Sequence, residues 1–181
     1  MSEVDALLKT YERHVRVPWP TDVAPEQRVW FVVYDPTQER RLRLRLGSFE
    51  AATREAGHDY DWRLLDLTKD FAQWMADHPY REAYFEEPAD MELALSDFAD
   101  VVAERVEDTL KEVDAKTVVA LCGLGSLFSL MHVSDLVNRV APSMRSWLLV
   151  FFPGRYDESN YRLLDARDGW NYLAVPITAH S

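Results

Sequence analysis

The strongest constraint on the fold of this chain is a set of short apolar runs separated by amphipathic segments. Three runs are rich in β-branched and aromatic residues: "RVWFVVYDP" (28–36), "TVVALCG" (117–123) and "SWLLVFFPG" (146–154). A run without polar alternation is typical of a strand covered on both faces, as in a parallel sheet. Two further segments, "DWRLLDLT" (61–68) and "YLAVPI" (172–177), bring the prediction to about five strands.

Helical periodicity alternates with these strands. The predicted helices cover residues 4–15, a segment ending at Gly57, and residues 69–78, 96–113 and 126–140. Thr68 and Ser96 are placed to cap two of them. Alternation of this kind predicts a single α/β domain over residues 1–181, a three-layer sandwich around a mostly parallel sheet. We expect a Rossmann-like or P-loop-like topology without a functional P-loop.

The chain is strongly acidic, with 31 Asp and Glu against 20 Lys and Arg, for a net charge of −11. It therefore gains no general attraction to a polyanion, and unassisted binding to nucleic acid is disfavoured. The excess of Asp and Glu over Lys and Arg is concentrated in residues 77–114, which we interpret as solvated helix faces. Charges run through the N-terminus, and the apolar runs are too short to cross a bilayer. We expect a cytoplasmic protein with no membrane partner.

One dense basic run stands against this background, "ERRLRLRL" (39–46), which contains Arg40–Arg45. Alternation would place Arg41, Arg43 and Arg45 on one face of a strand, whereas a helix would spread them apart. These arginines could contact nucleic acid or an acidic protein surface, or they could be ordinary solvated side chains.

The segment "GLGSLFSLMH" (123–132) has the strand, glycine turn and helix order of a phosphate site. Gly123 and Gly125 are present, but a nucleoside-triphosphate loop also needs a lysine followed by Ser or Thr. Phe128 stands where the dinucleotide fingerprint needs a third glycine. A helix starting at Ser126 could hold an anion only weakly. The turn therefore predicts the architecture of a phosphate site without its chemistry.

Two aspartates, Asp35 and Asp66, lie at predicted strand exits. Phosphatases of the haloacid-dehalogenase type keep a nucleophilic aspartate at such a position, but within Asp-x-Asp, and residue 37 is Thr. Asp35 and Asp66 could share Mg²⁺ if their strands are neighbours; otherwise they serve turns and caps. The alternative function is thus a Mg-dependent phosphohydrolase or nucleotide-binding module using Asp35, Asp66 and the Gly123–Gly125 turn with Ser126.

No other complete catalytic or metal-binding pattern is found. The five histidines have no familiar metal spacing, and Cys122 cannot form an internal disulfide and is interpreted as a small buried hydrophobe. We therefore predict no cofactor, no metal site and no enzymatic activity.

The C-terminal third carries a family resemblance. The matching residues of "WLLVFFPGRYDESNYRLLDARDGWNYLAVPI" (147–177) are Phe151, Phe152, Pro153, Gly154, Tyr156, Asn160, Tyr161, Leu163, Asn171 and Tyr172. They resemble the hydrophobic strand, Phe-Phe-Pro-Gly-x-Tyr end and final Asn-Tyr strand of BrxB, the small core protein of bacterial BREX phage-defence systems. The preceding strand, Gly-x-Gly turn and helix are also similar to that family.

The resemblance implies a role in a BREX system, which marks host DNA by adenine methylation and blocks phage replication. BrxB-like proteins have no established catalytic residues, so none is carried over to this chain. The resemblance implies an accessory subunit, whose most direct partner is the alkaline-phosphatase-like component PglZ, with DNA associated only through the complex.

The last predicted loop holds the candidate partner-binding residues, which are Arg155, Tyr156, Tyr161, Arg162 and Trp170. Tyr, Trp and Arg dominate interface hot spots because they combine large buried area with a polar group. The alternative is that Tyr161, Leu163 and Trp170 pack the loop onto the sheet.

Overall fold

A parallel sheet forms the centre of the molecule. The computed structural model describes residues 1–166 and 169–180, and across these residues five parallel strands follow the order β2-β3-β4-β1-β7. The strands are β1 (Val29–Tyr34), β2 (Asp61–Asp66), β3 (Thr117–Cys122), β4 (Trp147–Asp157) and β7 (Val175–Ile177). The predicted α/β fold with a mostly parallel sheet is confirmed.

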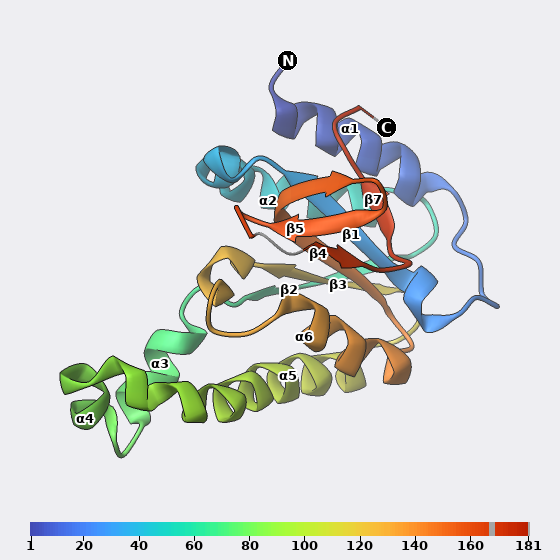
Figure 1. Ribbon diagram of the computed structural model, residues 1–181. Coiled ribbons are helices and arrows are strands. Elements are labelled where there is room, and N and C mark those ends of the chain that lie inside the picture. The colour runs from blue at the N-terminus through green and yellow to red at the C-terminus, as the bar shows by residue number, and fades with distance from the viewer. Residues whose placement is uncertain (167–168, 181) are drawn as a thin grey trace.

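Helices cover both faces of this sheet (Figure 1). One face carries α1 (Glu3–Arg16) and α2 (Glu39–Arg54), and the other carries α5 (Leu95–Glu112) and α6 (Val133–Val140). Each face encloses its own apolar core, so the predicted three-layer sandwich is also confirmed. Two shorter helices, α3 (Asp70–Asp77) and α4 (Arg81–Glu86), connect β2 to α5.

The central strands are buried on both faces, as their uninterrupted apolar sequences predict. All six residues of β1 are buried; Phe31 and Val33 point into one core, while Trp30 and Val32 point into the other. Cys122 at the end of β3 is also buried, and burial raises the pKa of its thiol to about 12. Its environment is that of a small hydrophobe.

Three local predictions were wrong. The helix expected from residue 126 begins only at Val133, because Leu124 and Leu127 are buried within a 3-10 turn, η4 (Leu124–Leu127). Thr68 does not cap α3, since its hydroxyl donates instead to Asp66. Ser96 lies inside α5, which begins at Leu95.

The segment expected to be a polar loop after Pro153 and Gly154 is a β-hairpin. Strand β4 continues to Asp157 and pairs in antiparallel fashion with β5 (Asn160–Leu163), which pairs with β6 (Trp170–Asn171). Gly154 permits this continuation because a Cβ there would overlap the carbonyl of Arg162. We call β4 from Gly154, with β5 and β6, the hairpin; it lies beside the main sheet (Figure 1).

The connection between α3 and α5 projects away from the sandwich (Figure 1). It contains α4 and a 3-10 segment, η3 (Pro88–Ala94), and none of residues 76–97 is buried. We call residues 76–97 the arm. It is folded into short helices but contributes no side chain to the buried core.

Candidate functional site

Asp35 and Asp66 do not share a site. Strands β1 and β2 are separated by β4 and β3, which places the two strand ends three spacings of about 4.8 Å apart, roughly 14 Å. Asp35 Oδ1 instead accepts hydrogen bonds from the amide of Thr37 at 2.8 Å and its hydroxyl at 2.7 Å. These bonds lower the pKa of Asp35, which therefore has the turn role considered for it. Within residues 1–166 and 169–180, no cluster of three or more His, Cys, Asp or Glu is placed to hold a metal.

Asp66 belongs to a polar network that ties α2 to the end of β2. Arg43 donates from Nε to Glu39 at 2.8 Å and from Nη1 to Asp66 at 2.9 Å, while the Tyr34 hydroxyl donates to Glu39. The Thr68 amide donates to Asp66 at 3.0 Å. Burial would raise the pKa of Asp66, but the hydrogen bonds from Arg43 and Thr68 outweigh it and lower that pKa to about 2. The network keeps Asp66 ionised and engaged within the protein.

The glycine turn after β3 packs against this network. Gly123 has φ +79°, and a Cβ at this position would lie 2.7 Å from both the Thr68 amide nitrogen and Asp66 Oδ1. Only glycine therefore fits both the backbone conformation and the space. Gly125 has no such requirement, since its nearest neighbours lie at 3.8 Å or more. Of the two glycines, only Gly123 is required by the structure, because it packs against Asp66 and Thr68 at the end of β2.

A recess of about 280 Å³ lies at this edge of the sheet. Gly123, Gly125 and Ser126 all line it, whereas Asp35 and Asp66 do not. Its charged groups are Glu39 and Arg43, which pair with each other. The expected helix start at Ser126 is absent here, because the turn is 3-10 and α6 begins seven residues later, at Val133.

The arginines of residues 40–45 lie on α2 and do not form one basic face. Arg43 is held in the Asp66 network, and Arg45 Nη2 lies 3.1 Å from Asp5 Oδ1 on α1. Arg41 is exposed and donates to Gln38. The helix spreads these side chains, so the single-face arrangement that a strand would have given is not formed.

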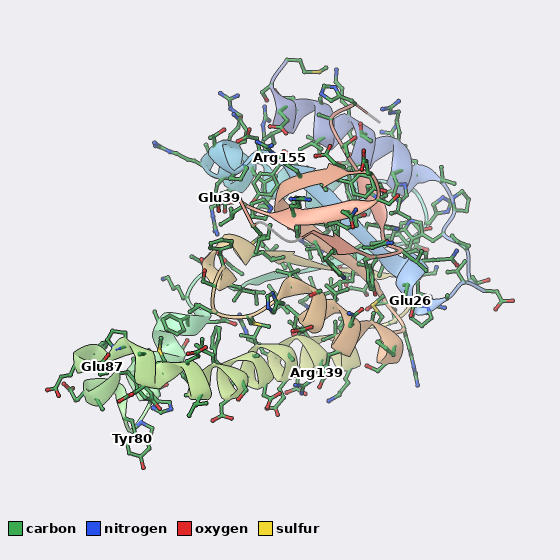
Figure 2. All side chains as sticks on the ribbon, viewed as in Figure 1. Glu26, Glu39, Tyr80, Glu87, Arg139 and Arg155 are labelled. Carbon is green, nitrogen blue, oxygen red and sulfur yellow. The ribbon has the colours of Figure 1, made fainter. Side chains whose placement is uncertain are left out.

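The hairpin separates the predicted partner-binding residues onto two faces. Arg155 and Arg162 are directly opposite each other and exposed, whereas Tyr156 pairs with Tyr161 and Tyr161 with Trp170 on the inner face. Tyr156 and Trp170 are partly buried against the core. Figure 2 shows Arg155 in the upper part of the molecule, away from the arm at the lower left.

Tyr161, one of the candidate partner-binding residues, is buried in the core. Its side chain is only 1% exposed, its hydroxyl donates to the Ala174 carbonyl at 3.0 Å, and its ring lies 4.5 Å from that of Phe31. Burial raises the pKa of Tyr161, so the hydroxyl stays protonated as a donor. Tyr161 anchors the hairpin, which is the packing alternative considered for it.

A groove of about 330 Å³ beside the hairpin was missed by the sequence reasoning. It lies between the loop before α6 and the hairpin, and its lining includes Phe128, Met131, His132 and Trp170. Residues 126–132 had been assigned to a helix, which would have hidden this groove. The apolar cluster "LFSLM" (127–131) was the available signal, and Ser129 within it has a left-handed backbone, φ +64°.

No helix in the described ranges has the length and apolarity to cross a membrane. No curated protein and no solved structure matches the chain. A family model does match it: the model described as "BREX protein BrxB" covers residues 70–177, from α3 through the arm and hairpin to β7. Because this match spans more than half of the 181 residues, the chain belongs to the BrxB family of the BREX phage-defence system.

Proposed function

We propose that this protein is a non-catalytic interaction subunit of a BREX complex that binds the PglZ component and supports host DNA methylation and phage restriction. The position of the family match supports this assignment. Residues 70–177 include the hairpin and exclude Asp35, Asp66 and Arg40–Arg45. The part of the chain that defines the family is therefore the part that carries the hairpin arginines, not the aspartates of the enzymatic alternative.

One observation carries the proposal: Arg155 and Arg162 stand opposite each other on an anchored hairpin. Both side chains are exposed, so a partner can reach them. In a chain of net charge −11, the two guanidinium groups form a local cationic spot suited to carboxylates of a partner.

The test is co-purification of the tagged protein with PglZ expressed from the same operon. Arg155→Ala combined with Arg162→Ala should reduce the retained PglZ by about tenfold or more, because both cationic contacts are lost. The matched control is Arg63→Ala, which removes an exposed arginine from β2, outside the family match. Retention of PglZ at the level of the unmodified protein by the double variant would overturn the assignment.

The enzymatic alternative would have to use the recess beside Gly123, Gly125 and Ser126. Titration with Mg-ATP separates the two functions. The interaction subunit should give no saturable binding up to millimolar nucleotide. Saturable binding that Ser126→Trp abolishes would favour the nucleotide-binding module instead, because the bulky side chain would fill the recess.

A further inference from the structure

No residue of the arm is buried, whereas the four helices that cover the sheet, α1, α2, α5 and α6, each bury part of one face. Helix α4 has six residues and η3 has seven, and isolated helices of this length are unstable in water. They pack against each other and against the start of α5, yet none of residues 76–97 reaches the core. A segment built in this way gains order when a partner covers it.

Large apolar side chains are concentrated on and beside this segment. Among the described residues, nine large apolar side chains are exposed, and four of them fall in residues 80–101: Tyr80, Phe85, Leu93 and Val101. Tyr80 is 66% exposed and Val101 is 48% exposed. Single exposed hydrophobics are ordinary, but their concentration in one projection marks an interaction surface.

A groove of about 780 Å³ joins the base of the arm to α5, and we call it the α3–α5 groove. Trp74 and Val101 give it an apolar floor, and His78 and Pro79 line its outer end. The His78 ring lies between the groove and the arm: its centroid is 4.8 Å from that of the Trp74 ring and 6.0 Å from that of the Tyr80 ring. The groove therefore adjoins the arm through His78.

The charged lining of the groove is nearly balanced, with Asp66, Asp70 and Asp77 against Lys69 and Arg105, and the acidic excess lies beside it on α5 and the arm. Asp77 lines it directly, and Asp97 and Glu104 lie one helical turn before and after Val101 on α5, both exposed. At the end nearest the sheet, Arg105 bonds to Asp70, so that cation is already neutralised. Residues 76–97 contain seven Asp and Glu side chains and one basic side chain, Arg81.

We propose that the α3–α5 groove and the adjoining arm form a second docking surface, which binds a basic amphipathic helix of another protein. Apolar side chains of that helix would cover Trp74, Val101 and Tyr80, and its Lys or Arg residues would meet the carboxylates of the arm and of the exposed face of α5. The same charges disfavour nucleic acid, and they disfavour a second copy that presents the same acidic surface. This inference goes beyond the proposed function, because the arm and Arg155 lie in separate parts of the molecule (Figure 2).

The probe is a synthetic Lys/Leu peptide of about 18 residues with leucines at helical spacing, followed by fluorescence anisotropy. A shuffled peptide of the same composition has the same charge but no apolar face. The amphipathic peptide should bind more tightly than the shuffled one, and Tyr80→Ser and Val101→Ser should each weaken it about fivefold or more. Equal binding of both peptides, or no binding of either, would overturn the proposal.

Matched controls locate the surface. Leu44→Ser removes a side chain that is 80% exposed on α2 and should leave peptide affinity unchanged. Glu104→Gln should weaken binding at low salt, whereas Glu112→Gln, near the end of the same helix, should not. If the control variants weaken binding as much as the groove variants, the surface is assigned wrongly.

Two further measurements separate this inference from the alternatives. Arg155→Ala combined with Arg162→Ala should leave peptide binding intact, so failure of the hairpin proposal and failure of this one are distinguishable. Light scattering should show that self-association, if present, is insensitive to Val101→Ser. A dimer dissolved by Val101→Ser would assign the groove to a second copy and overturn the proposed partner.

Discussion

The hairpin and the arm both extend beyond the α/β sandwich, but they are held by opposite means. The hairpin places Tyr161 in the core, with its hydroxyl bonded to Ala174 and its ring against Phe31. The arm, residues 76–97, has no buried side chain and exposes Tyr80, Phe85 and Leu93. The hairpin is therefore anchored in the core without a partner, whereas the apolar side chains of the arm remain exposed to solvent.

This difference separates two kinds of interaction surface. A fixed hairpin presents Arg155 and Arg162 in one geometry, which reduces the ordering cost of binding. The arm can adapt to a partner but loses conformational entropy when it is covered. Substitutions in the two regions should therefore differ far more in their effect on folding than on binding.

The sharpest test of this contrast is Tyr161→Ala. Removing a fully buried aromatic side chain costs about 3–5 kcal/mol, so the free energy of unfolding in urea should fall by that amount. Tyr161→Phe keeps the ring and loses only the bond to Ala174, for a cost of about 1 kcal/mol. A loss below 1 kcal/mol for Tyr161→Ala would show that the hairpin is not anchored through this residue.

Gly123→Ala tests the turn that follows β3 and packs against the end of β2. The left-handed backbone and the approach of Thr68 should make it destabilising by about 2 kcal/mol or more in urea unfolding. Gly47→Ala is the matched control, because that glycine is inside α2 with no atom within 4 Å of a new Cβ. It should stabilise the protein by about 0.5–1 kcal/mol. Equal effects of the two substitutions would contradict the packing role of Gly123.

The ion pair between Arg43 and Asp66 predicts a smaller, pH-dependent effect. Because the pKa of Asp66 is lowered to about 2 in the folded protein, its stabilising contribution is present above the ordinary pKa of 3.8 and is lost as the pH falls toward 2. Both partners are partly exposed, so the contribution is about 1 kcal/mol or less.

Urea unfolding between pH 5 and pH 2 measures this contribution. Asp66→Asn and Arg43→Gln should both reduce the fall in stability across that interval relative to the unmodified chain. Identical pH profiles for all three proteins would mean that the network contributes nothing to folding.

The strands were predictable because their signal is local. Unbroken apolar sequence marked β1, β3 and β4, and the charged face opposite Val102 and Val106 marked α5. The family resemblance was likewise carried by residues close together in sequence. These features needed no knowledge of which strand lies beside which.

The candidate site was harder to predict because it depends on strand order. Asp35 follows β1 and Asp66 is the last residue of β2, but only the order β2-β3-β4-β1 shows that two strands separate them. Pro153 and Gly154 suggested an end to β4, whereas Gly154 in fact admits the carbonyl of Arg162 and lets the strand continue. Tyr161 was assigned equally to surface and core, since one aromatic residue in a polar segment is compatible with both.

The smallest expected effect on folding is in the arm. Phe85→Ser and Leu93→Ser change side chains that are 65% and 92% exposed, so each should alter the free energy of unfolding by no more than about 0.5 kcal/mol. Phe98→Ser, just beyond the arm and fully buried, is the contrasting variant and should cost several-fold more. Amide hydrogens of residues 79–95 should also exchange faster than those of β4 and β5, because their helices lack core contacts. A loss above 1 kcal/mol for Leu93→Ser, with slow exchange in the arm, would mean that this segment folds with the core and that the contrast with the hairpin is wrong.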